Sequence, residues 1–340
     1  MQKKTFLHAA AAVVGMSGLM WAQTAGSSAI KPVPETGSLQ PAHGTKFTFI
    51  VAGDNRPANA TSPQPPTPGQ IFDAAKKEGA AFVVWTGDTI YGLDDADPGG
   101  IGKQYKEFFT LAARAGVPVF NAPGNHEMDV KVKHDKNRKE VGSAAMENLY
   151  RKNMRIAEGN PIYGAFSYAN ARFILLNTEE IPPPGVTRSP MAIVGDSMDP
   201  AGQVNLDPGY VSPEQMNWLS AELAANKATH TFIFMHHPIK PKKADMGLDK
   251  KNAEDLVRLF AKYQNISYVF ASHEHLYYNP QTRDTTAPPN RTAPSKDPPY
   301  YLISGGAGAH QAPGDFHNYL VVSVDGKHIK VRMVQCSDKC

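Results

Sequence analysis

The stretch "KFTFIVAGDNRP", residues 46–57, decides how the rest of the chain is interpreted. Its apolar run is typical of a buried β-strand, and it ends in a Gly-Asp pair that is well suited to hold a cation. Two residues after Asp54 stands Arg56, whose side chain is positively charged at any physiological pH. The sequence therefore raises the question of why a permanent cation lies beside a candidate cation ligand.

Strand-like and helix-like segments alternate along the chain from residue 46 onward. Strands are predicted at 46–53, 81–88, 117–127, 230–238, 266–275, 300–310 and 318–334, helices at 69–80, 102–116, 212–226 and 249–265, and a hairpin at 163–179 that turns at Ala169-Asn170. This alternation predicts an α/β protein with a parallel or mixed sheet covered by helices. Because no repeat or clean boundary interrupts the pattern, we expect a single domain over residues 46–335.

The charge balance argues against a nucleic-acid-binding surface. The 340 residues contain 35 Lys and Arg against 32 Asp and Glu, a formal net charge of +3. A nuclease is expected to carry a basic groove, and a balance this close to neutral does not predict one. We therefore expect no nucleic-acid partner and keep a secreted nuclease only as an alternative.

The N-terminus has the layout of a secretory signal peptide. A basic start, "MQKK", precedes an apolar stretch that is short for a membrane span, and small residues follow. We predict a signal peptide at 1–25, a Pro-containing leader at 26–45, and a secreted or periplasmic protein without a stable membrane anchor. The alternative is a disordered N-terminus that is not cleaved.

The only two cysteines, Cys336 and Cys340, lie in the predicted tail 336–340. In an oxidising compartment these cysteines are expected to close a small disulfide loop. A frayed tail with two free thiols is the alternative.

Five strand-like segments end in side chains of one chemical type. These endings are "GD" at 53–54, "GD" at 87–88, "GNHE" at 124–127, "HH" at 236–237 and "HEH" at 273–275. In open α/β sheets the functional site lies beyond the carboxyl ends of the strands. Carboxylates, an amide and imidazoles without a thiolate suit Mn, Fe or Zn, so we predict a metal site there.

In this order, "GD", "GDTIY", "GNHE", "MHHP" and "SHEH" resemble the signature series of the calcineurin-like metallophosphoesterase superfamily, which includes the purple acid phosphatases. The resemblance runs from about Phe47 to His310. It implies a four-layer αββα sandwich of two facing mixed β-sheets flanked by helices. It also implies two divalent or trivalent metal ions and a small phosphate-ester substrate.

The resemblance assigns a role to each motif position. Asp54 and His275 would bind the first metal, Asn125, His236 and His273 the second, and Asp88 would bridge the two. His126 would steady the phosphate or protonate the leaving group, with a purely orienting role as the alternative. Glu127 and His237 would orient the metal ligands rather than bind metal.

Two positions depart from the family pattern. Ser272 stands where Gly is usual, and Arg56 stands where a His commonly completes the first metal's ligands. We hypothesise that Arg56 acts catalytically as a clamp, pairing with Asp54 and donating two hydrogen bonds to phosphoryl oxygens. The alternative is that Arg56 points outward and pairs with a surface carboxylate.

The sequence thus predicts an exported dinuclear-metal phosphoesterase that acts on phosphate mono- or diesters, as a phosphatase or a phosphodiesterase. A non-catalytic binding or scaffold protein that retains the fold is the alternative from another class. We expect the residues that select the substrate to lie in the loops 57–69, 129–160, 181–211 and 279–299. The acidic segment 94–100 is predicted as a solvated loop, and "GGAGAH", 305–310, as a close-packed turn near the site.

Overall fold

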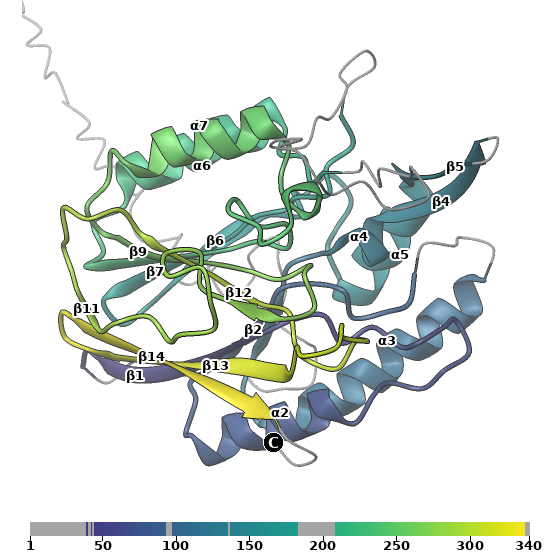
Figure 1. Ribbon diagram of the computed structural model, residues 1–340, viewed down its shortest axis with the longest axis horizontal. Helices are drawn as coiled ribbons and strands as arrows, with labels where there is room; N and C mark the ends of the chain where they lie inside the picture. Colours follow the sequence, from purple (N-terminus) through teal and green to yellow (C-terminus); the bar gives the residue numbers. More distant parts are fainter. Residues whose placement is uncertain are drawn as a thin grey trace, which may run out of the picture.

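Two facing β-sheets form the centre of the molecule, and helices cover both outer faces (Figure 1). The computed structural model describes residues 39, 42, 44–92, 97–134, 137–182 and 208–336. The arrangement confirms the predicted four-layer αββα sandwich of mixed sheets. The predicted signal peptide, residues 1–25, lies outside the described residues, as does most of the leader.

The first sheet has the strand order β11-β14-β13-β1-β2-β3. Its strands are β1 (Lys46–Ala52), β2 (Val83–Trp85), β3 (Val119–Asn121), β11 (Arg291–Thr292), β13 (His317–Asp325) and β14 (His328–Cys336). β1, β2 and β3 are parallel, with Ile50 opposite Val83, whereas β13 pairs antiparallel with β1. The helices α2 (Thr67–Lys77) and α3 (Pro98–Ala112), with the short turn η2 (Ala113–Ala115), pack on the outer face.

The second sheet has the strand order β10-β12-β9-β8-β7-β6. Its strands are β6 (Gly164–Tyr168), β7 (Ala171–Leu175), β8 (His230–Phe234), β9 (Ile266–Ala271), β10 (Tyr277–Tyr278) and β12 (Tyr300–Ser304). β7, β8, β9 and β12 are parallel, and β6–β7 form the predicted hairpin around Ala169-Asn170. The helices α6 (Pro213–Ala225) and α7 (Lys250–Phe260) cover this sheet.

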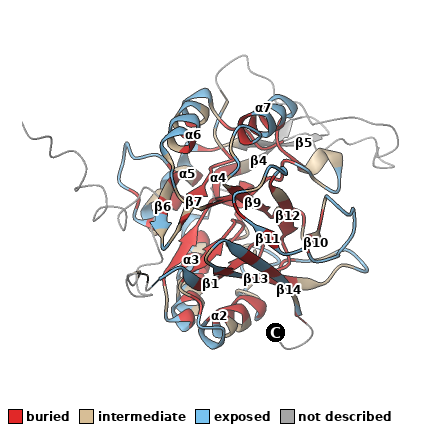
Figure 2. Cartoon of the chain, turned by 90° about the vertical axis from the view of Figure 1, so that its left-hand side faces the viewer, coloured by how far each residue is buried: buried red, intermediate tan, exposed pale blue. Residues whose placement is uncertain are grey.

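Aromatic side chains fill the space between the two sheets. Phe49 and Phe82 from the first sheet meet Phe173 from the second with ring centroids 5.3 and 4.9 Å away. All three side chains are fully buried, and Figure 2 shows buried residues concentrated in the sheets. Burial of each Phe side chain stabilises the folded state by about 1.5–3 kcal/mol, so this aromatic layer holds the two sheets against each other.

Some elements differ from the sequence prediction. Helix α3 starts at Pro98, inside the segment predicted as a solvated loop, because Asp97 caps it by accepting a hydrogen bond from the Gly100 N–H at 2.9 Å. The stretch 129–160, predicted only as a loop, contains a hairpin and a helix. These are β4 (Asp129–His134), β5 (Asn137–Gly142) and α5 (Ala144–Met154).

The two ends of the chain leave two predictions open. Among the described helices, none combines the length and apolar character needed to cross a bilayer. Cys336 ends β14 and is disulfide-bonded, but Cys340 lies outside the described residues. The disulfide within the tail therefore stays a prediction.

Candidate metal centre

Five strands of the two sheets deliver the predicted ligands to one edge of the sandwich. Asp54 follows β1, Asp88 follows β2, Asn125 starts the short helix α4 (Asn125–Met128) after β3, His236 follows β8, and His273 and His275 follow β9. The two sheets meet here, since His236 lies 3.4 Å from Asp88 and 3.7 Å from Asp54. The convergence expected from the strand ends is present in the structure.

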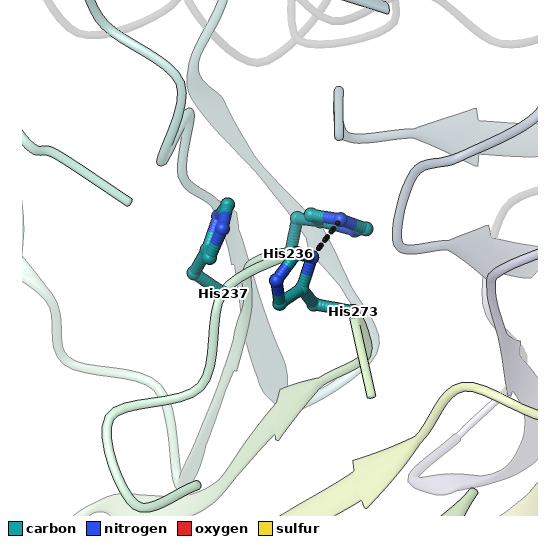
Figure 3. Close-up of side chains that lie close together, drawn as sticks. All are labelled: His236, His237 and His273. Atoms are coloured by element: carbon teal, nitrogen blue, oxygen red, sulfur yellow. Dashed lines mark hydrogen bonds between the residues drawn. The ribbon is translucent and has the colours of Figure 1, made fainter. Parts of the chain in front are cut away.

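The centre has two halves, and in the first, the His236 half, three other donor atoms surround Nε2 of His236. It lies 3.1 Å from Asn125 Oδ1, 3.1 Å from His273 Nδ1 and 3.4 Å from Asp88 Oδ1. Nδ1 of the same ring donates to the Thr86 carbonyl at 2.8 Å, so Nε2 keeps its lone pair. Figure 3 shows His236 and His273 turned toward each other. Four donor atoms of the kinds that bind Mn, Fe or Zn thus converge on one point.

Asp54 and Asp88 belong to the other half, for which His275 is the further predicted ligand. Ligand atoms of Asp54, Asp88 and His236 all lie within 4.8 Å of one another. Asp54 is fully buried, and its carboxylate oxygens accept no hydrogen bond of normal geometry from a described residue, although the backbone N–H of His273 interacts with them at poorer geometry. His275 lies on the wall of the adjoining cavity and donates from Nδ1 to the His310 carbonyl at 2.7 Å, which leaves Nε2 as a ligand atom.

Three of the predicted ligands have a backbone conformation that side-chain-bearing residues rarely adopt. Asp54, Asp88 and His273 have φ angles of 62°, 55° and 69°. Such residues cost on the order of 1–3 kcal/mol each and persist where the surroundings fix them, typically at functional sites. Here the Asp54 N–H donates to the Gly87 carbonyl at 3.1 Å.

The loops after β2 and β3 approach each other closely at two glycines, Gly87 and Gly124. A Cβ at Gly87 would lie only 2.6 Å from the Gly124 nitrogen, so this approach is possible only because both positions are Gly.

Glu127 fastens these two loops together. Its buried carboxylate accepts hydrogen bonds from the backbone N–H groups of Asp88, Thr89 and Gly124 at 2.9, 2.6 and 2.7 Å. Burial, together with the charge of Asp88, raises the pKa of Glu127 to about 7. The position agrees with the predicted orienting role of Glu127.

The electrostatics of the centre favour a bound cation. Burial, followed by the charge of Asp88, holds the pKa of Asp54 well above its usual range. Burial, followed by the neighbouring rings of His237 and His236, holds the pKa of His273 well below its usual range. Buried carboxylates that repel each other and imidazoles that stay neutral both gain from a cation placed between them. The donor set therefore fits metal binding.

His126 and Arg56 line the cavity next to the ligands. His126 donates a hydrogen bond from Nδ1 to the Tyr91 carbonyl, and its Nε2 lies 3.8 Å from Asp88 Oδ2. Arg56 Nε lies 3.9 Å from the same Asp88 oxygen, and a quarter of the side chain is exposed. Arg56 thus points into the cavity rather than outward. Its nearest carboxylate partner is Asp88, which corrects the predicted pairing with Asp54.

His237 and Glu179 are joined behind the ligands. His237 Nδ1 lies 2.6 Å from Glu179 Oε1, and the His237 ring lies next to the His273 ring, tilted by 36° with 3.9 Å between centroids (Figure 3). This position agrees with the predicted orienting role of His237. The sequence prediction missed Glu179, although it follows β7 in "NTE", another strand with a polar carboxyl end.

Ser272 and the segment 305–310 pack tightly against the centre. Ser272 Oγ donates to the Thr86 carbonyl at 2.6 Å, the same oxygen that accepts from His236. A Cβ at Gly305 would lie 2.1 Å from Asp54 Oδ2, so the backbone approaches the carboxylate there only because the residue is Gly. This close contact agrees with the predicted packed turn.

A cavity of about 270 Å³ opens onto the ligands. The described residues that line it away from the ligands come from two segments, 243–246 and 310–315. The loops 57–69, 129–160 and 279–299, which we predicted to select the substrate, contribute none of its described lining. Most of the fourth loop, 183–207, lies outside the described residues. Whether these loops contact the substrate therefore stays a prediction, because chain order does not reveal which turns border the cavity.

The chain matches one protein-family model, described as calcineurin-like phosphoesterase, over residues 47–277. None of the curated proteins compared with the chain matches it.

Several solved structures share the fold at low sequence identity. A purple acid phosphatase from yellow lupin (Lupinus luteus) seeds has a TM-score of 0.59 and 17% identity, covering 88% of this chain and 53% of the phosphatase, so the chain spans about half of that protein. A dimetal phosphatase from Danio rerio has a TM-score of 0.56 and 18% identity, covering 86% and 99%. GAP50, an anchor in the inner membrane complex of Plasmodium, has a TM-score of 0.50 and 12% identity, covering 87% and 86%.

Proposed function

The chain belongs to the calcineurin-like phosphoesterase family, which comprises metal-dependent hydrolases of phosphoester bonds, and on that premise we propose its specific activity. The protein is an exported, dinuclear-metal phosphoesterase that hydrolyses small phosphate mono- or diesters. In this reaction water forms a new bond to phosphorus, the phosphorus–oxygen bond to the leaving group breaks, and the leaving group departs as an alcohol.

One observation carries the proposal. Both carboxylate oxygens of Asp54 are buried without a hydrogen bond of normal geometry from a described residue, beside Asp88 and His236. A buried, unpaired carboxylate is costly, so such a group is retained where a cation binds it. This feature favours an intact metal centre over a scaffold protein that has lost its activity.

The metal-binding residues are assigned as the family resemblance implies, and the convergence of these side chains supports the assignment. Asp54 and His275 would hold the first cation, Asn125, His236 and His273 the second, and the two oxygens of Asp88 would be shared between the halves. The chemistry that bound cations supply at such ligands is neutralisation of phosphoryl oxygens and a lower pKa for the attacking water. Ligands without a thiolate support Mn, Fe or Zn.

His126 serves the leaving group. The Tyr91 carbonyl occupies Nδ1, so Nε2 is the atom that faces the cavity and can give a proton to the departing oxygen. The same hydrogen bond fixes the plane of the ring, which keeps Nε2 in place during the reaction.

Arg56 binds the phosphoryl group. Its Nε makes no hydrogen bond with a described residue, and the side chain lines the cavity beside Asp88. The planar guanidinium can offer two parallel N–H groups to two phosphoryl oxygens. Because it stands where the family commonly has a His ligand, the first cation has fewer protein ligands than the second.

A turnover screen tests the proposal. The mature protein is loaded with manganese, iron or zinc, its metal content is measured by elemental analysis, and phosphate release is followed on monoesters, diesters and nucleotides. We expect two metal ions per chain and turnover of a generic aryl phosphate. A protein that binds metal without any turnover would be a scaffold, as the anchor role of GAP50 illustrates for this fold. Turnover confined to nucleic acid would identify a nuclease instead.

Export is supported only by the N-terminal sequence. Expression of the full chain with its N-terminus intact, followed by mass spectrometry of the secreted or periplasmic fraction, tests it. We expect a product that lacks about the first 25 residues. A full-length product that stays with the cells would refute export.

A further inference from the structure

The segment 240–246, at the mouth of the cavity, is hydrogen-bonded to a residue that stands between two predicted metal ligands. The backbone N–H groups of Lys242 and Lys243 donate to the carboxylate of Glu274 at 2.6 and 3.0 Å. Glu274 is 2% exposed and stands between the predicted ligands His273 and His275. The backbone of this segment therefore has a defined position relative to the metal centre.

A second segment completes the mouth and is tied to the first. Lys242 Nζ lies 3.6 Å from Asp315 Oδ1, which joins 240–246 to the segment 310–315. Gln311 donates from Nε2 to the His275 carbonyl at 3.3 Å, so this segment is also connected to the ligands. Both walls of the mouth are thus held in place before a substrate arrives, which lowers the cost of ordering on binding.

Most charged groups that line the cavity already have a partner. Arg56 and His126 face Asp88, Glu274 accepts the two backbone N–H groups, and Asp315 pairs with Lys242. Lys243 and Asp245 are different: the charge of Lys243 acts on Glu274 from a distance, but neither side chain forms an ion pair within 4.0 Å or a hydrogen bond with a described residue. Lys243 is exposed and Asp245 is half-buried, and both line the cavity. The mouth therefore presents one ammonium and one carboxylate, two residues apart on a fixed segment.

We propose that Lys243 and Asp245 are specificity-determining residues that bind a leaving group carrying both an anionic and a cationic group. The substrate class is a small phosphate ester of a zwitterionic alcohol, such as a free O-phosphorylated hydroxy-amino acid. Its phosphate lies at the metal centre, its carboxylate at Lys243 and its ammonium at Asp245. This inference rests on the proposed phosphoesterase function and names the substrate class of that site.

Three matched substrates separate the two contacts. O-Phosphoserine carries both charges, phosphoethanolamine lacks the carboxylate, and 3-phosphoglycerate has a hydroxyl in place of the ammonium. We expect kcat/KM of the metal-loaded enzyme to be highest for O-phosphoserine. Lys243→Ala lowers the ratio of kcat/KM for O-phosphoserine over phosphoethanolamine by about fivefold, and Asp245→Ala lowers the ratio over 3-phosphoglycerate by a similar factor, as expected for a partly exposed ion pair.

Matched controls and a binding measurement keep the outcomes distinct. Lys262→Ala and Glu158→Ala remove exposed charges outside the cavity and should leave both ratios unchanged. If the kcat/KM ratios are the same in wild type, Lys243→Ala and Asp245→Ala, the inference is overturned. Turnover of these esters would still support the proposed function. If no ester is turned over, the proposed function fails. Calorimetry of O-phosphoserine and phosphoethanolamine binding to the same proteins then tests the inference on its own. Equal affinity for the two ligands would then overturn the inference.

Discussion

The two halves of the metal centre are built differently. Around His236 Nε2, the donor atoms of Asn125, His273 and Asp88 lie within 3.4 Å. Around Asp54, the remaining predicted ligands are Asp88 and His275, and Arg56 stands at the position where the family resemblance leads us to expect a further His. Arg56 Nε lies 3.9 Å from Asp88, the carboxylate that the two halves share.

This difference predicts unequal metal affinity and a division of labour. The His236 half has more predicted protein ligands, so we expect it to bind its cation more tightly. The Asp54 half loses a ligand but gains a guanidinium that can bind the substrate. Asp88 joins the halves, since its Oδ1 faces His236 and its Oδ2 faces Arg56.

Asp88→Asn should abolish the centre as a whole, the largest effect that we expect. The neutral amide removes the charge that both cations share, so both metals are lost together and kcat/KM falls by more than the roughly 10⁴-fold upper range for an acid–base group. Elemental analysis after dialysis and phosphate release measure the two effects. Normal metal content with normal turnover would refute a shared carboxylate.

His126→Ala should leave both halves loaded and slow only the chemistry. We expect a loss of roughly 10²–10⁴-fold on alkyl esters, whose leaving groups need a proton, and a much smaller loss on activated aryl esters. Comparing kcat/KM for the two ester types, with metal content as a control, tests this. Equal losses on both would instead mark His126 as a phosphate or structural contact.

Arg56→His should make the two halves more alike. The new imidazole can ligate the first cation, so this cation should be retained longer on dialysis, while KM rises or kcat falls by about tenfold through loss of the two charge-assisted hydrogen bonds. Arg114→His, which changes an Arg that pairs with Asp73 on the surface, serves as the control. If metal retention and kinetics both stay at the wild-type level, Arg56 has no role at the centre.

Ser272→Ala should weaken only the His236 half, and only slightly. It removes the hydroxyl that shares the Thr86 carbonyl with His236 but leaves the His236 hydrogen bond at 2.8 Å. We expect the second cation to bind up to about tenfold more weakly, the low end for a group behind a ligand. Competition with a chelator measures this affinity. Ser323→Ala, which removes an exposed hydroxyl from β13 of the first sheet, serves as the control. Unchanged affinity would show that the hydroxyl does not orient His236.

The sequence by itself determined the fold class and which side chains meet at the ends of the strands. Strand segments that end in Asp, Asn or His predict both the parallel strands and a site beyond their carboxyl ends, because both features follow from local patterns. Helix α6 is an example at the level of one element, since Ser212 and Pro213 mark its start in the sequence and the structure begins it there. The orienting roles of Glu127 and His237 also agree with their positions.

Only the tertiary structure decided which atoms face the centre and what surrounds them. His236 exposes Nε2 because its Nδ1 meets the carbonyl of Thr86, 150 residues earlier in the chain. Arg56 faces Asp88 rather than Asp54, which is closer in the sequence, and Lys243 and Asp245 line the cavity although they lie far from the ligands along the chain. Such contacts depend on how separate strands are placed side by side, and no periodicity within a segment encodes the distance between two turns of different sheets.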